Sequence, residues 1–256
     1  MKVDKVVLIK QRPIFFCHIP KTGGTSLRAA ISQNFRPNEK MPGPGLMKEY
    51  GGHYPPVSRI KREMDARASD IRLMIGHYHW SARQLMTNPI TMVVLREPVA
   101  QLISHMRHFI SAGHLTVEGC LAAIDRGKMP VQSNIITRYL GGDIFASDLP
   151  IDRQHGRYMN GPTDNRAMEE AKRAIRSADL LGYTEDLGAF TRAVTQELGI
   201  SVPVLELNQA KADQMTLSEA QMDTIRSSLA LDIELYRYAR DIRPPQHGLS
   251  ASERTS

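Results

Sequence analysis

The chain has 256 residues, 41% of them hydrophobic and 23% charged, which is enough to bury the core of one large α/β domain. Its net charge of +6 suits a polyanionic partner, and a nucleotide, an acidic glycan and a nucleic acid all have that character. Because Arg and Lys are scattered and aromatic residues make up only 6%, a dedicated nucleic-acid surface is not expected.

Neither the cysteines nor the apolar segments indicate secretion or a membrane. The two cysteines, Cys17 and Cys120, lie in apolar surroundings and indicate neither a disulfide framework nor a zinc knuckle. The apolar run at 6–9 is too short for a secretory signal, and no later run is long enough to span a bilayer. We therefore expect a cytoplasmic protein without a membrane span.

The first predicted elements are a strand and a helix joined by a glycine-containing loop. Residues 14–19 form an apolar, β-prone run that Pro20 ends. After the glycines, Thr25 or Ser26 is expected to cap a helix. The following segment, 36–56, is rich in Pro and Gly, which predicts a long irregular connection that is either functional or mobile.

The later elements alternate between strands and helices. Further strands are predicted at 71–75, 90–95 and 180–183. Pro98 suits the first turn of a helix whose buried stripe contains Val99, Leu102, Ile103, Met106 and Ile110. More helices are predicted at 116–125, 131–140, 164–177, 187–198 and, as a pair, 217–239. We assign 1–243 to one domain and expect 244–256 to be a disordered tail.

This alternation predicts a single α/β domain with a central, mainly parallel sheet flanked by helices. Sites in such sheets lie at the carboxyl ends of the strands. Three predicted strands end at 18–21, at Gly76-His77 and at Arg96, so each of these ends carries a cation or a potential base. We therefore expect the functional site at this edge of the sheet.

The loop 20–26 has the composition of a phosphate-binding loop. Its glycines allow close approach of backbone N–H groups to an oxyanion, and the following helix N-terminus adds partial positive charge. The alternative is an ordinary turn with a capping Thr and an unrelated Lys. Because Lys21 precedes the glycines, the order is not that of a Walker A loop, which argues against a kinase or NTPase.

The sequence HIPKTGGTSL at 18–27 resembles the phosphosulfate-binding loop of carbohydrate sulfotransferases, especially bacterial relatives of the heparan and uronyl 2-O-sulfotransferases. These enzymes take their sulfuryl group from 3′-phosphoadenosine 5′-phosphosulfate (PAPS) and release adenosine 3′,5′-bisphosphate. The second family signature is an Arg followed eight residues later by a Ser, here Arg96 and Ser104, which hold the 3′-phosphate. The resemblance implies that the donor is bound by Lys21, Thr22, Gly23, Gly24, Thr25, Ser26, Arg96 and Ser104.

The same resemblance, which extends over 14–239, implies a general base. The family pattern is a Gly-His at a strand end, and Gly76-His77 occupies that place. His77 would take the acceptor proton, while Lys21 would stabilise the leaving phosphate. In an extended segment His79 would share a face with His77, so it is a rival or a helper. Structural roles for both imidazoles are the alternative.

The acceptor and the partners are less defined by the sequence. The resemblance implies a saccharide hydroxyl, and the basic charge suits an anionic or carrier-linked acceptor, with contacts sought in 36–56. No residue cluster has the spacing of a metal site, so no metal is expected. Other readings are a nucleotide-dependent small-molecule kinase and a non-catalytic nucleotide-binding protein on the same fold. The sequence leaves the oligomeric state open.

Overall fold

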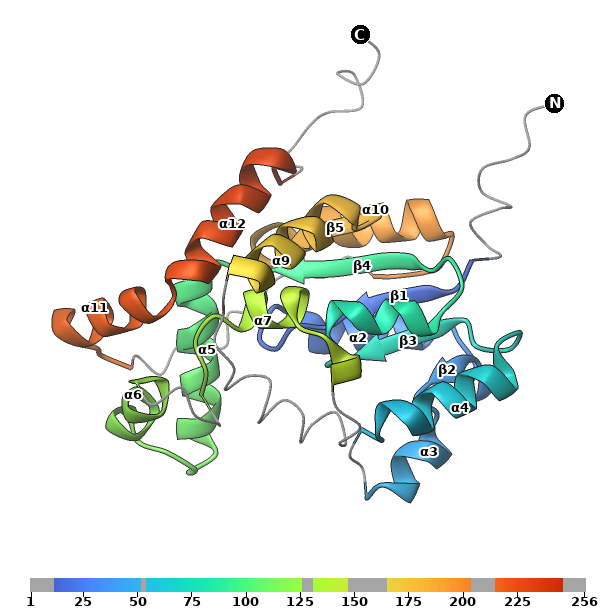
Figure 1. The fold of residues 1–256 in the computed structure, drawn as a ribbon. Coiled ribbons are helices and arrows are strands. Elements are labelled where there is room, and N and C mark those ends of the chain that lie inside the picture. Colours follow the sequence, from blue (N-terminus) through green and yellow to red (C-terminus); the bar gives the residue numbers. More distant parts are fainter. Residues whose placement is uncertain (1–11, 52–53, 126–130, 147–164, 204–214, 246–256) are drawn as a thin grey trace, which may run out of the picture.

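A five-stranded parallel sheet lies at the centre of the molecule (Figure 1). The computed structural model describes residues 12–51, 54–125, 131–146, 165–203 and 215–245. The strands are β1 (Ile14–Cys17), β2 (Lys40–Met41), β3 (Leu73–Gly76), β4 (Ile90–Leu95) and β5 (Leu180–Tyr183), in the spatial order β2-β3-β1-β4-β5. Every pair is parallel, with Cys17 beside Gly76 of β3 and beside Val93 of β4. The predicted α/β fold with a parallel sheet is confirmed.

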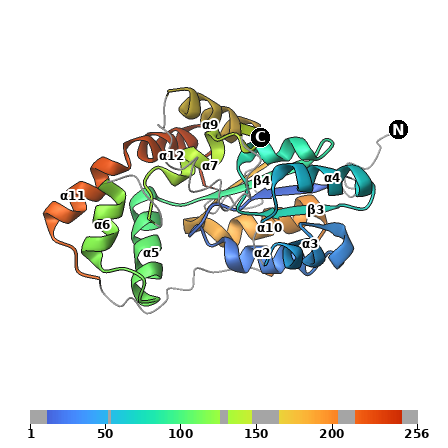
Figure 2. The same cartoon turned by 60° about the horizontal axis from the view of Figure 1, so that its bottom comes forward.

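Both faces of the sheet are covered, which is why its strands are continuous apolar runs. All residues of β1, β3 and β4 are buried. Side chains alternate between two core clusters: Phe15 and Cys17 belong to one, and Ile14 and Phe16 to the other. Figure 2 shows α7 and α9 on one side of the sheet and α2 and α10 on the other.

The helices of the first half are α2 (Gly24–Ser32), α3 (Pro44–Glu49) and α4 (Val57–Arg67), with a 3-10 turn η1 (Pro37–Glu39). The segment 36–56, expected to be irregular, contains η1, β2 and α3 in its described part. The prediction missed β2 because two residues carry no periodicity; Lys40 and Met41 become a strand by pairing with β3. It also missed α4, although Val57, Ile60 and Met64 have helical spacing and are buried.

The helices of the second half follow the predicted pattern. They are α5 (Pro98–Ser111), α6 (Val117–Asp125), α7 (Ile135–Gly141), α9 (Asn165–Ser177), α10 (Leu187–Leu198), α11 (Glu219–Ser228) and α12 (Ala230–Ile242). Short 3-10 helices are η2 (Trp80–Leu85), η3 (Ile144–Ala146) and η4 (Thr184–Asp186). None of the helices within the described ranges is both long and apolar enough to cross a bilayer. Of the predicted tail, only residues 244 and 245 are described.

Helix α5 leads from the edge of the sheet into a separate helical cluster with α6 and α11 (Figure 1). Leu102 and Met106 are buried in that cluster, as the predicted stripe requires. Val99, Ile103 and Ile110 are partly buried and pack against it. The apolar stripe of α5 therefore packs in this cluster from Val99 in its first turn to Ile110 near its end.

A buried carboxylate joins α7 to α12. Asp232 is completely buried, and its two oxygens accept hydrogen bonds from the backbone N–H groups of Ile136 (2.9 Å) and Thr137 (2.8 Å) and from the Thr137 hydroxyl (2.7 Å). The side chain of Asn134 completes the junction, since it accepts from the Asp232 N–H and donates to the Ser228 carbonyl. Helix α7 begins at Ile135 and not at 131 as predicted, because Asn134 has φ 53 and Asp232 satisfies the first N–H groups.

Candidate active site

The loop between β1 and α2 turns through two residues in the left-handed region. Gly23 has φ 76, and Lys21 has φ 65, a conformation that costs a non-glycine residue about 1 kcal/mol. Gly23 is the N-cap and α2 begins at Gly24, so the prediction that Thr25 or Ser26 caps the helix is wrong. The left-handed glycine starts the helix earlier, which places these two hydroxyls, both exposed, in its first turn.

The loop conformation is held by three hydrogen bonds. The Thr22 hydroxyl, which is buried, donates to the Ile19 carbonyl at 2.9 Å. From the other side, Arg96 Nη1 donates to the Lys21 carbonyl at 3.0 Å, and Gln101 Nε2 donates to the Pro20 carbonyl at 2.8 Å. The unusual backbone of Lys21 is therefore stabilised by residues that follow β4.

The position of the loop is the one where ligands bind in open α/β sheets. The strand order places β2 and β3 on one side of β1, and β4 and β5 on the other. The chain thus changes direction across the sheet between β1 and β4, which is the topological switch point. Lys21 follows β1 and Arg96 follows β4, so the predicted phosphate loop and the predicted phosphate-binding arginine meet there.

His18 packs between the start of α2 and His77. A Cβ atom on Gly24 would lie 2.0 Å from Cδ2 of His18, so only glycine leaves room for this imidazole. The ring of His18 is 3% exposed and stacks on that of His77, with centroids 4.5 Å apart and an interplanar angle of 28°. Burial, together with His77 and Arg28, lowers the pKa of His18 to about 3, so this ring is neutral at physiological pH.

His77 has the protonation pattern of a general base. Its Nδ1 lies 2.8 Å from the His18 carbonyl oxygen. Because a carbonyl only accepts, Nδ1 carries the proton and donates, and Nε2 keeps a lone pair. Burial lowers the pKa of His77, the hydrogen bond to His18 opposes this, and Arg28 lowers it further. The imidazole is therefore neutral near pH 7 and able to accept a proton at Nε2.

His79 does not share the surroundings of His77. The strand ends at Gly76, so the extended geometry that would align the two imidazoles does not continue. His79 is 2% exposed, and its ring lies against Tyr139 of α7 with centroids 5.4 Å apart. Burial lowers the pKa of His79 to about 4. His77, by contrast, contacts the loop region through His18.

The turn after β4 fixes Arg96 at the start of α5. The Glu97 carboxylate caps the helix, since it accepts from the N–H groups of Val99 (3.1 Å) and Ala100 (2.7 Å). Glu97 donates its own N–H to Glu185 at 2.8 Å. Ser104 lies about two turns into α5 and is half-buried, and no hydrogen bond within the described part of the chain joins it to Arg96.

Several cations lie around the loop, and the carboxylates of Glu97 and Glu185 near Arg96 form no ion pair with them among the described residues. Burial and the nearby Arg96 lower the pKa of the Lys21 ammonium group. Burial also lowers the pKa of Arg96, against the effect of Glu185. Among the described residues, the ion pairs include neither Lys21, Arg28, Arg96 nor Arg107. Such a set of unpaired cations at a helix N-terminus favours a bound anion.

Metal ligands do not gather here or elsewhere in the described ranges, where no group of three or more His, Cys, Asp or Glu residues is arranged to hold a metal ion.

Among the solved structures similar to this chain is the crystal structure of a sulfotransferase from Alicyclobacillus acidocaldarius. The likeness has 15% sequence identity, covers 90% of this chain and 95% of that chain, and has a TM-score of 0.48. No protein-family model matches the sequence, and no curated protein matches it.

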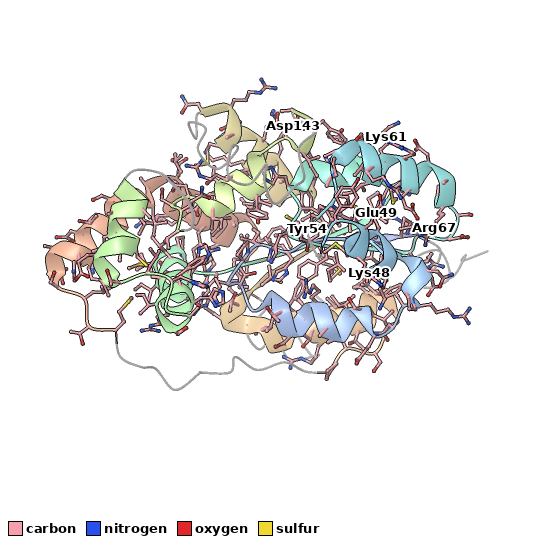
Figure 3. The ribbon with its side chains drawn as sticks, turned by 90° about the horizontal axis from the view of Figure 1, so that it is seen from below. Lys48, Glu49, Tyr54, Lys61, Arg67 and Asp143 are labelled. Atoms are coloured by element: carbon pink, nitrogen blue, oxygen red, sulfur yellow. The ribbon has the colours of Figure 1, made fainter. Side chains whose placement is uncertain are left out.

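Some residues of the site were not found from the sequence. Gln101 lies inside the Arg96–Ser104 signature, but its bond to Pro20 depends on how α5 meets the loop. Tyr54 lies over the end of β3: its hydroxyl accepts the His77 backbone N–H at 3.3 Å, and a Cβ on Gly76 would lie 2.4 Å from it. Figure 3 labels Tyr54 on the side of the molecule formed by α3 and α4. The only sequence signal was its place in the 36–56 segment, where acceptor contacts were expected.

Proposed function

We propose that the protein is a sulfotransferase that uses PAPS as donor. The proposed acceptor is a hydroxyl group of a saccharide. One observation supports this proposal above the others: two kinds of group lie at the same loop. Arg96 holds the backbone of Lys21 at the switch point, and the neutral imidazole of His77 contacts His18 at the start of that loop. A cation for a leaving phosphate and a base for an attacking hydroxyl are the two groups that this reaction needs.

The residues around the loop fit the chemistry of the donor. When bound, PAPS supplies an activated sulfuryl group on a phosphate leaving group. Lys21, the first N–H groups of α2 and the hydroxyls of Thr25 and Ser26 would hold the 5′-phosphosulfate. Arg96, with Ser104 further along α5, would hold the 3′-phosphate. Thr22 contributes mainly to the loop itself, because its hydroxyl proton is used on Ile19.

Two side chains carry the proposed chemistry. His77 Nε2 accepts the proton of the acceptor hydroxyl, and the His18 carbonyl orients the ring through Nδ1–H. Lys21 balances the negative charge on the departing phosphate oxygen, and its partly buried position strengthens that interaction. Positioning and electrostatics supply most of the rate in this mechanism.

The first prediction concerns the nucleotide. Adenosine 3′,5′-bisphosphate is expected to raise the melting temperature more than ATP or AMP at the same concentration, because only it offers a phosphate to each end of the cationic site. At 100 times its dissociation constant, a ligand stabilises the fold by about 2.7 kcal/mol. Thermal unfolding with each nucleotide measures this.

Two outcomes would contradict the proposal. Equal or better stabilisation by ATP with magnesium would support a small-molecule kinase. No response to any of the nucleotides would support a non-catalytic role for the fold.

The second prediction concerns Arg96. Arg96→Ala is expected to lower the affinity for the bisphosphate by about 10- to 150-fold, which is the effect of losing a charged contact of about 1.5–3 kcal/mol. Adenosine 5′-phosphosulfate lacks the 3′-phosphate. Because Arg96 also holds the Lys21 carbonyl, the affinity for this nucleotide is expected to fall too, but by much less. Isothermal titration with both nucleotides measures the difference.

Arg237→Ala is the matched control, since Arg237 is exposed on α12 and forms no ion pair within the described residues. It is expected to leave both affinities unchanged. If Arg96→Ala weakens the two nucleotides by the same factor, Arg96 supports the loop and does not bind the 3′-phosphate.

A further inference from the structure

One face of α5 is directed at the phosphosulfate-binding loop. Gln101 on that face donates a hydrogen bond to the Pro20 carbonyl at 2.8 Å. His105 lies four residues later, so it occupies the next position on the same face of the helix. Side chains on a helix lean toward its N-terminus, which for α5 is the end that meets the loop. The His105 imidazole is therefore placed beside the loop, next to Ser104.

Within the described part of the chain, the hydrogen bonds do not account for the position of His105. It is half-buried, and its ring packs on Phe109 with centroids 5.1 Å apart. Neither ring nitrogen takes part in a hydrogen bond within the described part of the chain. Burial lowers the pKa of His105 to about 4, helped by Lys21, His108 and His77. The imidazole is neutral near pH 7, with one N–H donor and one lone pair.

His105 lies on the side of α5 that faces the loop, the side on which Gln101 bonds to Pro20. Its electrostatic interactions with Lys21, after β1, and His77, after β3, agree with this placement. In the proposed function, Lys21 acts on the leaving phosphate and His77 on the attacking hydroxyl. A group on the side of α5 that faces the loop is in a position to meet the part of the donor that the loop holds.

We propose that His105 is a further catalytic residue, whose neutral imidazole donates a hydrogen bond to an oxygen of the sulfuryl group. This inference rests on the proposed function. A fixed neutral donor stabilises charge on the sulfuryl oxygens and gives up no proton, so it does not compete with His77 for the role of base. It also adds no further cation next to Lys21.

Two ligands that differ only in the sulfuryl group test this proposal. PAPS and adenosine 3′,5′-bisphosphate share the adenosine and both phosphates, so a contact to the sulfuryl group affects only PAPS. His105→Ala is expected to lower the affinity for PAPS by about 10-fold and to change the affinity for the bisphosphate by less than about 2-fold. His105→Gln, which retains an N–H donor, is expected to recover part of the loss. Titration calorimetry on the full chain measures both affinities.

His108→Gln is the control, because His108 is exposed one turn further along α5. It is expected to bind both ligands like the wild type. Equal weakening of PAPS and the bisphosphate by His105→Ala would show a structural role and overturn the inference, as would unchanged affinity for both. If the wild type binds neither ligand, the proposed function itself fails. If wild type and Arg96→Ala behave as predicted while His105→Ala binds like the wild type, only this inference fails.

Discussion

His77→Ala is expected to bind adenosine 3′,5′-bisphosphate as tightly as the wild type while its sulfuryl-transfer rate falls by roughly 10²–10⁴-fold. The base acts on the acceptor proton and not on the donor phosphates, so only the chemical step should suffer. The wild-type ring is prepared for this role by its Nδ1–H bond to the His18 carbonyl, which leaves the Nε2 lone pair available. Lys21→Ala is expected to differ, because its charge meets the donor before and during transfer, and both affinity and rate should fall.

The rate measurement needs an acceptor, which a screen of saccharides with radiolabelled PAPS would supply. Because burial and Arg28 lower the pKa of His77, the wild-type rate is expected to fall with decreasing pH only below the ordinary histidine value of 6.5. His79→Ala is the comparison: its ring fills space beside Tyr139, so this variant should lose stability. If folded His79→Ala is inactive while His77→Ala transfers normally, the base has been assigned to the wrong imidazole.

The fold was predictable where the sequence has a strong local pattern. The runs at 14–17, 90–95 and 180–183 are apolar, and continuous apolar strands are what a sheet covered on both faces requires. Helix α10 ends at Leu198 as predicted, because Gly199 takes the left-handed conformation, with φ 63, that ends helices. These features depend on neighbouring residues alone, so a single sequence contains them.

The site was predictable in its parts but not in its assembly. Motif order indicated Lys21, His77 and Arg96, yet the hydrogen bond from Arg96 to the Lys21 carbonyl joins residues far apart in the chain. The start of α2 was misplaced because a cap was sought among hydroxyl residues, whereas Gly23 takes that position with its positive φ. The stacking of His18 on His77 likewise depends on the β1–β3 pairing, which no local pattern contains.

The packing of α7 against α12 depends on Asp232, which the sequence pattern placed in a helix without giving it a role. Asp232 receives three hydrogen bonds from the first turn of α7, and Asn134 is bonded to the backbone on both sides of it. In the sequence, Asp232 is one acid among many on an amphipathic segment. Only the meeting of α7 with α12 makes it a buried cap.

Asp232→Ala is expected to lower the free energy of unfolding by about 3 kcal/mol, since it leaves buried donors of Ile136 and Thr137 without an acceptor. For a chain of this size, that loss corresponds to a fall in melting temperature of roughly 6–12 °C. Urea unfolding at pH 8 is the measurement, because burial raises the pKa of Asp232 to about 6 and the wild-type carboxyl is then ionised. Asp241→Ala, an exposed acid on the same helix, is expected to change stability by less than about 0.5 kcal/mol. Equal unfolding midpoints for the two variants would contradict the prediction, because these hydrogen bonds would then do no more than offset the cost of burying the ionised carboxylate.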